Sequence, residues 1–127
     1  MKEIISIIRM NKMNQTKQAL AEAGYPAMLC KKVNGRGKKM INVDILEDLI
    51  EGKEVSSPEV LETITEKGRL IAKRLLTIVA PDEDVKKIID IIIEINQSGN
   101  MGDGKIFVCD VEEAIRVRTG ELGNQAI

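Results

Sequence analysis

Three short segments of this 127-residue chain combine glycine with lysine or arginine. They are residues 34–39 (NGRGKK), 99–105 (GNMGDGK) and 116–121 (RVRTGE). Glycine lets backbone N–H groups approach an anion closely, and a neighbouring cation supplies charge-assisted hydrogen bonds to phosphate. In the third segment, Arg116 and Arg118 would project from the same side of an extended strand, where two guanidinium groups suit a polyphosphate. The spacing therefore predicts an anion site without identifying the anion.

Each segment also has a purely structural interpretation. Residues 35–37 could form a loop hinge, and Asp103-Gly104 is an ordinary turn dipeptide before a strand. The two arginines could form a solvated edge that discourages aggregation of the sheet. Residues 102–105 (GDGK) are not a Walker A loop, because the first glycine is not at the required spacing and no Ser or Thr follows. These alternatives stay open from spacing alone.

The composition excludes several classes of function. Histidine is absent, so Ser-His-Asp, Cys-His and histidine–zinc sites cannot be built from this chain alone. Nineteen basic and 20 acidic residues give a net charge of -1, which offers no electrostatic reason to expect binding to nucleic acid or to anionic membranes. Aromatic residues are only 2%, so we expect no stacking platform for bases.

The cysteines and the apolar stretches indicate a cytoplasmic protein. Cys30 and Cys109 lie far apart in apolar surroundings; their spacing leaves a disulfide open, but we expect two buried free thiols in a reducing compartment. The first ten residues lack the uninterrupted apolar core of a signal peptide. The longest apolar stretch, residues 88–95, carries two carboxylates and is too short to cross a bilayer. We therefore expect no membrane insertion.

The hydrophobic pattern predicts a ferredoxin-like βαββαβ sandwich of the α+β class. Residues 3–9 are rich in isoleucine and indicate a strand that is buried on both faces. Two helices on one face of an antiparallel sheet satisfy this order of elements. The expected strands are 3–9, a strand within 27–38, 74–80, 105–111 and a short fifth strand at 114–118, and the expected helices are 14–23 and 81–97.

The face of the sheet that the helices leave open is also expected to be apolar. A chain of this size commonly buries such a face by forming an oligomer. A monomer with a partly apolar surface is the alternative, and the pattern favours it less.

A long insertion separates the second and third expected strands. Residues 38–72 exceed the length at which loops usually become functional or disordered, and parts of them have helical spacing. The insertion could be an amphipathic decoration packed on its own domain. It could equally be a mobile arm that docks a partner through its apolar stripe.

Residues 98–121 (SGNMGDGKIFVCDVEEAIRVRTGE) resemble the C-terminal signature of the PII signal-transduction family, whose usual form is close to TGxxGDGKIFV followed by IRIRTGE. The opening MKEIISIIR, the helix ending in ALAEAGYP, the glycine segment 33–37 and the strand ending in IVAP (78–81) also match. The resemblance covers nearly the whole chain apart from the insertion, which corresponds to the family's T-loop. The length of the insertion and its lack of tyrosine most resemble those of the nitrogenase-associated archaeal subgroup. Within that subgroup, they are most similar to the second of the two paralogues.

The resemblance implies one domain over residues 1–127, with an extended T-loop at 38–72 and a nucleotide-binding signature at 98–121. It implies a trimer with ATP or ADP in the clefts between subunits, and 2-oxoglutarate bound beside the phosphates through Mg²⁺, near Lys73 and Lys39. The implied nucleotide contacts are Gly35, Gly37, Lys38, Val79, Gly102, Asp103, Gly104, Lys105, Arg116 and Arg118.

The chain departs from the family pattern at four places, one of which is Leu29, where many members have a threonine near the nucleotide. Lys39 stands where the family usually has Gln, and a protonated lysine does not ligate magnesium, so the metal contact stays open. Lys38 replaces an arginine, which keeps the charge and loses the planar fork. The single tyrosine, Tyr25, follows the first helix, so uridylylation of a T-loop tyrosine is not expected.

The resemblance implies a nitrogen-status sensor rather than an enzyme. The expected targets are the dinitrogenase component of nitrogenase and a sister paralogue, in a homo- or hetero-oligomer, with 2-oxoglutarate relieving inhibition. A regulator of an ammonium transporter or of glutamine synthetase is the alternative. A slow ATP-hydrolysing enzyme and a purely structural oligomer are two further alternatives, the former disfavoured by the absence of histidine and of a Walker lysine.

Overall fold

The computed structural model describes residues 1–37 and 70–127. The chain divides into two compact units, residues 1–33 with 73–127 and residues 34–72. Most of the predicted insertion, and both helical patterns within it, lie outside the described residues. The described elements are β1 (Lys2–Arg9), the 3₁₀ helix η1 (Met10–Lys12), α1 (Met13–Glu22), β2 (Leu29–Gly35), β3 (Ile71–Ala80), α4 (Asp82–Asn96), β4 (Gly104–Asp110) and the 3₁₀ helix η2 (Gly123–Ala126).

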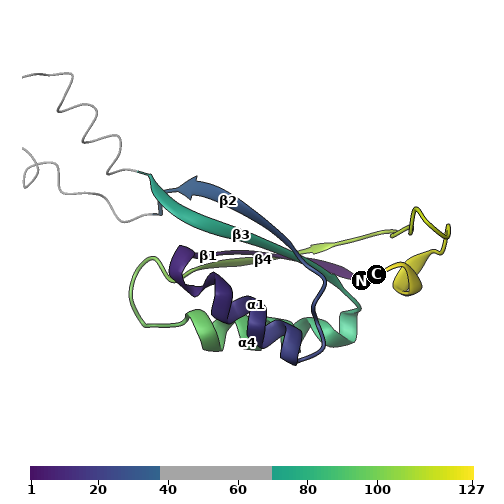
Figure 1. Ribbon diagram of the computed structural model, residues 1–127, viewed down its shortest axis with the longest axis horizontal. Coiled ribbons are helices and arrows are strands. Elements are labelled where there is room, and N and C mark those ends of the chain that lie inside the picture. The colour runs from purple at the N-terminus through teal and green to yellow at the C-terminus, as the bar shows by residue number, and fades with distance from the viewer. Residues whose placement is uncertain (38–69) are drawn as a thin grey trace, which may run out of the picture. The chain divides into compact units, whose positions relative to one another are not determined.

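The four strands form one sheet in the order β2-β3-β1-β4, with β1 between two antiparallel neighbours (Figure 1). On one side Lys2 is paired with Ala80, and the register continues to Arg9 opposite Lys73. On the other side β1 pairs with β4, from Lys2 opposite Asp110 to Ile8 opposite Gly104. The isoleucines at positions 4, 5, 7 and 8 suit this central position because β-branched side chains pack well on a pleated surface.

Both long helices, α1 and α4, cover one face of the sheet (Figure 1). α4 begins after Pro81 and carries three acidic residues in its first turn, where the helix dipole favours negative charge. This arrangement confirms the predicted ferredoxin-like sandwich. The buried apolar residues of the core come from β1, α1, β3 and α4, and are Ile4, Ile8, Met13, Leu20, Leu76, Ile78, Ala80, Ile88 and Ile92.

The prediction that β1 is buried on both faces is wrong for the single chain. Its burial alternates, with Ile4 and Ile8 almost fully buried under the helices and Ile5 and Ile7 only partly buried. The reason is that α1 and α4 lie on the same face. On β4, Phe107 pairs with Ile5 and is 49% exposed, so the open face is apolar as expected.

The cysteines are free, as predicted, but both are exposed rather than buried. Cys30 lies on β2, a strand at the edge of the sheet. Cys109 pairs with Glu3, a residue on the open face of the sheet. The apolar neighbours along the sequence therefore indicated strands correctly and burial wrongly.

The predicted fifth strand at residues 114–118 does not form. Only an isolated bridge joins Ile115 to Leu122, and the residues between them make a turn. The turn closes with a 2.7 Å hydrogen bond from the Gly120 N–H to the carbonyl oxygen of Arg116, and Gly120 has a φ of 72°. Glycine adopts this left-handed conformation without the steric cost that other residues incur.

Among residues 1–37 and 70–127, no helix has the length and apolar character needed to span a membrane.

Candidate functional site

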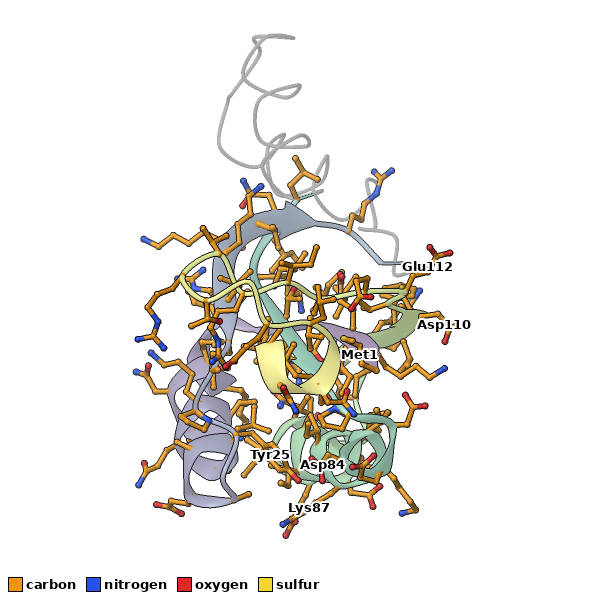
Figure 2. All side chains as sticks on the ribbon, turned by 90° about the vertical axis from the view of Figure 1, so that its right-hand side faces the viewer. Met1, Tyr25, Asp84, Lys87, Asp110 and Glu112 are labelled. Atoms are coloured by element: carbon orange, nitrogen blue, oxygen red, sulfur yellow. The ribbon has the colours of Figure 1, made fainter. Side chains whose placement is uncertain are left out.

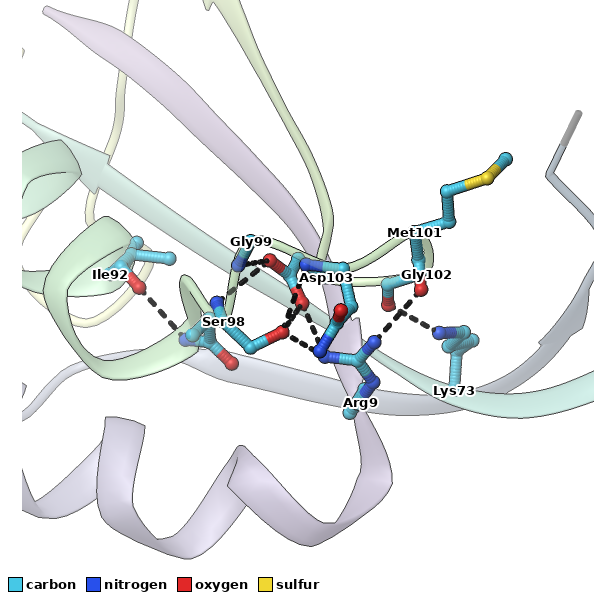
Figure 3. A network of polar contacts seen from close by, with 10 residues as sticks. Arg9, Lys73, Ile92, Ser98, Gly99, Met101, Gly102 and Asp103 are labelled. Atoms are coloured by element: carbon cyan, nitrogen blue, oxygen red, sulfur yellow. Dashed lines mark hydrogen bonds and ion pairs between the residues drawn. The ribbon is translucent and has the colours of Figure 1, made fainter. Parts of the chain in front are cut away.

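The candidate site is built around the glycine loop, which we define as residues 98–103 between α4 and β4 (Figure 3). Asp103 closes this loop on itself. One oxygen of its carboxylate accepts hydrogen bonds from the N–H groups of Ser98 at 2.8 Å and Gly99 at 3.0 Å, and the other accepts from the Ser98 hydroxyl. These bonds from Ser98, together with Arg9 and Gly99, hold the pKa of the Asp103 carboxyl well below its usual range, although burial acts in the opposite direction.

Arg9, the last residue of β1, is a component of this site that sequence reasoning missed. Its guanidinium forms an ion pair with the Asp103 carboxylate and donates a 2.9 Å hydrogen bond to the carbonyl oxygen of Met101 (Figure 3). The side chain is 28% exposed. The available signal was a cation at the end of the first predicted strand, residues 3–9.

Lys73 lies on the neighbouring strand, directly opposite Arg9. Its ammonium donates a 2.8 Å hydrogen bond to the carbonyl oxygen of Gly102. Burial and the nearby Arg9 charge lower the pKa of Lys73, and the Asp103 carboxylate partly offsets this. Two cations therefore meet one carboxylate at the glycine loop, which leaves an excess of positive charge suited to an anion.

Two glycines of the site are required by geometry. A Cβ at Gly104 would overlap the carbonyl oxygen of Ile7, because β4 begins pairing with β1 at this residue. A Cβ at Gly102 would lie 3.3 Å from Nη2 of Arg9. Both residues also have positive φ, at 121° and 95°. Glycine thus permits the close approach of the loop to β1.

The remaining residues predicted in the first unit are spread along the sheet. Lys105 follows the loop on β4, is exposed and pairs with Ile7. Val79 is partly buried on β3 and pairs with Glu3, near the other end of β1. The structure thus brings Lys73, Gly102, Asp103 and Gly104 together, whereas Val79 lies further along the open face.

Arg116 and Arg118 lie at the opposite end of the sheet from the glycine loop. β4 carries the chain about 20 Å away from the loop, and Val111 then bonds to the carbonyl oxygen of Met1. Figure 2 faces this end of the molecule, where Met1, Asp110 and Glu112 are labelled. The predicted same-side projection of the two arginines from a strand is wrong, because they lie in and beside the turn.

Arg116 is held by its own C-terminal segment. Its guanidinium pairs with Glu121 at 2.6 Å and donates a 2.6 Å hydrogen bond to the carbonyl oxygen of Gln125. Arg118 is exposed and makes no ion pair within the part of the chain that the structure describes. The second unit holds Gly35, the last residue of β2, and Gly37. Lys38 and Lys39 lie outside the described residues.

A cavity of about 330 Å³ lies between α4 and β4, below the glycine loop. Its lining is mainly isoleucine, with polar atoms from Asn96, Gln97, Asp103 and Lys105. The amide of Asn96 is buried and donates to the Thr16 hydroxyl at 3.0 Å, which joins α4 to α1. The mainly apolar walls make this cavity unsuited to phosphate groups.

The described residues supply no magnesium site of their own. They contain no group of three or more His, Cys, Asp or Glu side chains that could hold a metal. The carboxylate of the glycine loop, Asp103, is already engaged by Arg9 and by the loop itself. Magnesium in proteins takes most of its ligands from water and phosphate oxygens, so an ion at this loop would depend on a bound ligand for its coordination.

Comparison with known proteins gives a consistent result. A family model described as "Nitrogen regulatory protein P-II" matches residues 1–121. The chain is 47% identical over 127 residues, with both proteins covered completely, to "Nitrogen fixation nifHD region glnB-like protein 2" of Methanococcus maripaludis. It is 42% identical to the protein of the same name from Methanobacterium ivanovii, covering 100% of this chain and 99% of that protein.

A solved structure is similar as well. The crystal structure of Arabidopsis thaliana PII bound to citrate aligns with a TM-score of 0.70 and 28% sequence identity. The alignment covers 98% of this chain and 87% of that chain. The family match spans the glycine loop, Lys73 and both C-terminal arginines.

Proposed function

This chain belongs to the nitrogen regulatory protein P-II family, and from that premise we propose that it is a cytoplasmic sensor that binds ATP or ADP and 2-oxoglutarate and regulates nitrogenase. Several relatives from methanogens have names that refer to the nifHD region, which supports a role in nitrogen fixation. The observation that carries the ligand part of the proposal is the excess of positive charge at the glycine loop. The proposed role of the protein is regulatory and not catalytic.

The phosphates of the nucleotide would lie at the glycine loop. Gly102, Gly104 and Lys105 supply a close backbone approach and a cation, and the family resemblance adds Gly35, Gly37 and Lys38. The adenine would lie against Val79 on the open face of the sheet. A site of this kind leaves the helices in place, because the open face carries no helix.

Arg116 and Arg118 would reach the same nucleotide from a neighbouring subunit. Within one chain they lie beyond the far end of β4, about 20 Å from the glycine loop. The apolar open face, with Ile5, Ile7 and Phe107 partly exposed, supports an oligomer that would cover it. We therefore propose a trimer, either of this chain alone or mixed with a sister paralogue.

2-Oxoglutarate would bind beside the phosphates through Lys73, with Lys39 near it. A dicarboxylate makes a stronger, charge-assisted bond to the ammonium than the neutral Gly102 carbonyl oxygen does. The similar Arabidopsis structure is bound to citrate, another polycarboxylate, which supports an anion of this class. Because the described residues supply no magnesium site of their own, we assign no step to the ion.

The signal would pass to residues 38–72, which end directly before Lys73. A ligand changes the position of this insertion only if it binds one arrangement more tightly than another. The proposed target of the insertion is the dinitrogenase component of nitrogenase. An ammonium transporter or glutamine synthetase is the competing target within the same family.

Isothermal titration with ATP, followed by 2-oxoglutarate, tests ligand binding, and a nitrogenase inhibition assay with and without residues 38–72 tests the target. We expect saturable binding of both ligands and loss of inhibition on deletion of the insertion. The absence of saturable ATP binding at low salt would overturn the sensor proposal. Inhibition that persists after the deletion would overturn the role of the insertion.

A further inference from the structure

We propose that Arg9 positions the glycine loop through Asp103, and that neither side chain contacts the nucleotide. This role rests on the proposed function and deepens it, because it concerns how the phosphate site is held in shape. It changes the role expected for Asp103, which the family resemblance implied as a nucleotide contact.

The acceptor capacity of Asp103 is filled within the glycine loop and by Arg9. An ionised carboxylate offers about four lone-pair directions on its two oxygens. One oxygen receives Arg9 and the Ser98 hydroxyl, and the other receives the N–H groups of Ser98 and Gly99 at 2.8 and 3.0 Å. No direction remains for a ribose hydroxyl. A carboxylate facing the phosphates would also repel them.

Arg9 reaches across the glycine loop. Nη1 contacts Asp103 and lies 3.4 Å from the Ser98 hydroxyl, while Nη2 donates to the Met101 carbonyl oxygen at 2.9 Å. One guanidinium thus joins the beginning, the middle and the end of the loop (Figure 3). Gly102 leaves room for this fork, because a Cβ there would lie 3.3 Å from Nη2.

The two cations, Arg9 and Lys73, differ in how they contact the loop. Lys73 makes one described hydrogen bond to the loop, at the Gly102 carbonyl oxygen. It can leave this bond for an anionic ligand while the several bonds of Arg9 keep the loop in place. A loop ordered in advance binds its ligand without the entropic cost of ordering. Arg9 thereby maintains the backbone geometry of the phosphate site.

A double-mutant cycle on ATP affinity tests this role. Arg9→Ala and Asp103→Asn are each expected to weaken ATP binding about tenfold, since each removes charge-assisted bonds that order the loop. The combined variant should bind about as weakly as either single variant, because both act through one ion pair. Arg9→Lys should restore part of the affinity, since a lysine can pair with Asp103 but cannot also reach Met101 as a fork.

Additive losses in the combined variant would overturn the role, because they would show that Arg9 acts on the nucleotide directly. Unchanged ATP affinity in Arg9→Ala would overturn it as well. Lys86→Ala is the matched control: it removes one cation and one ion pair, with Asp90 on the exposed surface of α4. Its ATP affinity should equal that of the unmodified protein.

Amide hydrogen exchange at Ser98 and Gly99, measured without nucleotide, separates this role from the proposed function. Both amides donate to Asp103 and should exchange several-fold faster in Arg9→Ala than in Lys86→Ala. Equal exchange in the two variants would overturn the positioning role even if ATP binds normally. If the unmodified protein binds no ATP, the sensor proposal fails, while the exchange rates still decide whether Arg9 holds the loop.

Discussion

The ammonium group of Lys73 donates a 2.8 Å hydrogen bond to the carbonyl oxygen of Gly102, so β3 is tied to the glycine loop by a single lysine. Lys73 also lies directly after residues 38–72 in the sequence. A ligand that takes this ammonium would therefore change a contact of the glycine loop and a residue at the base of the insertion at once. One anion could therefore affect both the glycine loop and the insertion.

Replacement of Lys73 by alanine is expected to weaken 2-oxoglutarate binding by about tenfold or more when ATP is present. The reason is the loss of a charge-assisted bond between the ammonium and a carboxylate. ATP affinity should change less, because Arg9 still holds the glycine loop. Isothermal titration measures both affinities. Unchanged 2-oxoglutarate affinity would exclude Lys73 from the ligand site.

Alanine at Arg116 or Arg118 is expected to weaken ATP binding by about 1.5–3 kcal/mol, the range for hydrogen bonds to a charged group. Because these arginines would come from a neighbouring subunit, oligomers mixed from two defective variants provide a sharper test. A subunit with Arg116→Ala still carries Lys105, and a subunit with Lys105→Ala still carries Arg116. Mixed oligomers should regain a fraction of the tight sites, as measured by titration with ATP. No recovery on mixing would place the complete site within one subunit.

Gly104→Ala is expected to destabilise the fold by about 2–4 kcal/mol, because a Cβ would overlap the Ile7 carbonyl oxygen and the residue has a φ of 121°. Gly99→Ala is the matched control, since Gly99 also has a positive φ of 82° but no atom within 4 Å of an added Cβ. It should cost about 1 kcal/mol. Urea unfolding measures both values. Equal losses would show that the approach of β4 to Ile7 is not what requires glycine.

The sequence predicted well those features that depend on neighbours along the chain. Isoleucines at residues 4–8 predicted the central strand, and Gly24 with Pro26 predicted the end of the first helix at the correct place. The dipeptide Asp103-Gly104 indicated a turn before a strand, and β4 begins at Gly104. Each of these signals reflects a local backbone preference.

Features that depend on distant partners were missed or predicted wrongly. The bond between Arg9 and Asp103 joins residues 94 positions apart, and no local pattern signals it. The alternation of Arg116 and Arg118 fits a strand, but the bridge between Ile115 and Leu122 and the positive φ of Gly120 give a turn instead. Cys109 lies within an apolar run, yet its exposure depends on which face of the sheet the helices cover.

The stability of the protein below pH 5 is expected to depend on Asp103. Its hydrogen bonds with Ser98 and Arg9 depress the pKa of the carboxyl in the folded state, whereas the unfolded chain has a value of about 3.9. A depressed folded pKa stabilises the protein fully above the unfolded value, and this contribution is lost as the pH falls below it toward the folded pKa. Asp103→Asn removes the titrating group and should give a shallower loss of unfolding free energy between pH 5 and pH 3, measured by urea unfolding. Subtracting the two profiles isolates the contribution of this carboxylate, and parallel profiles would show that Asp103 is not held in its charged form by the loop.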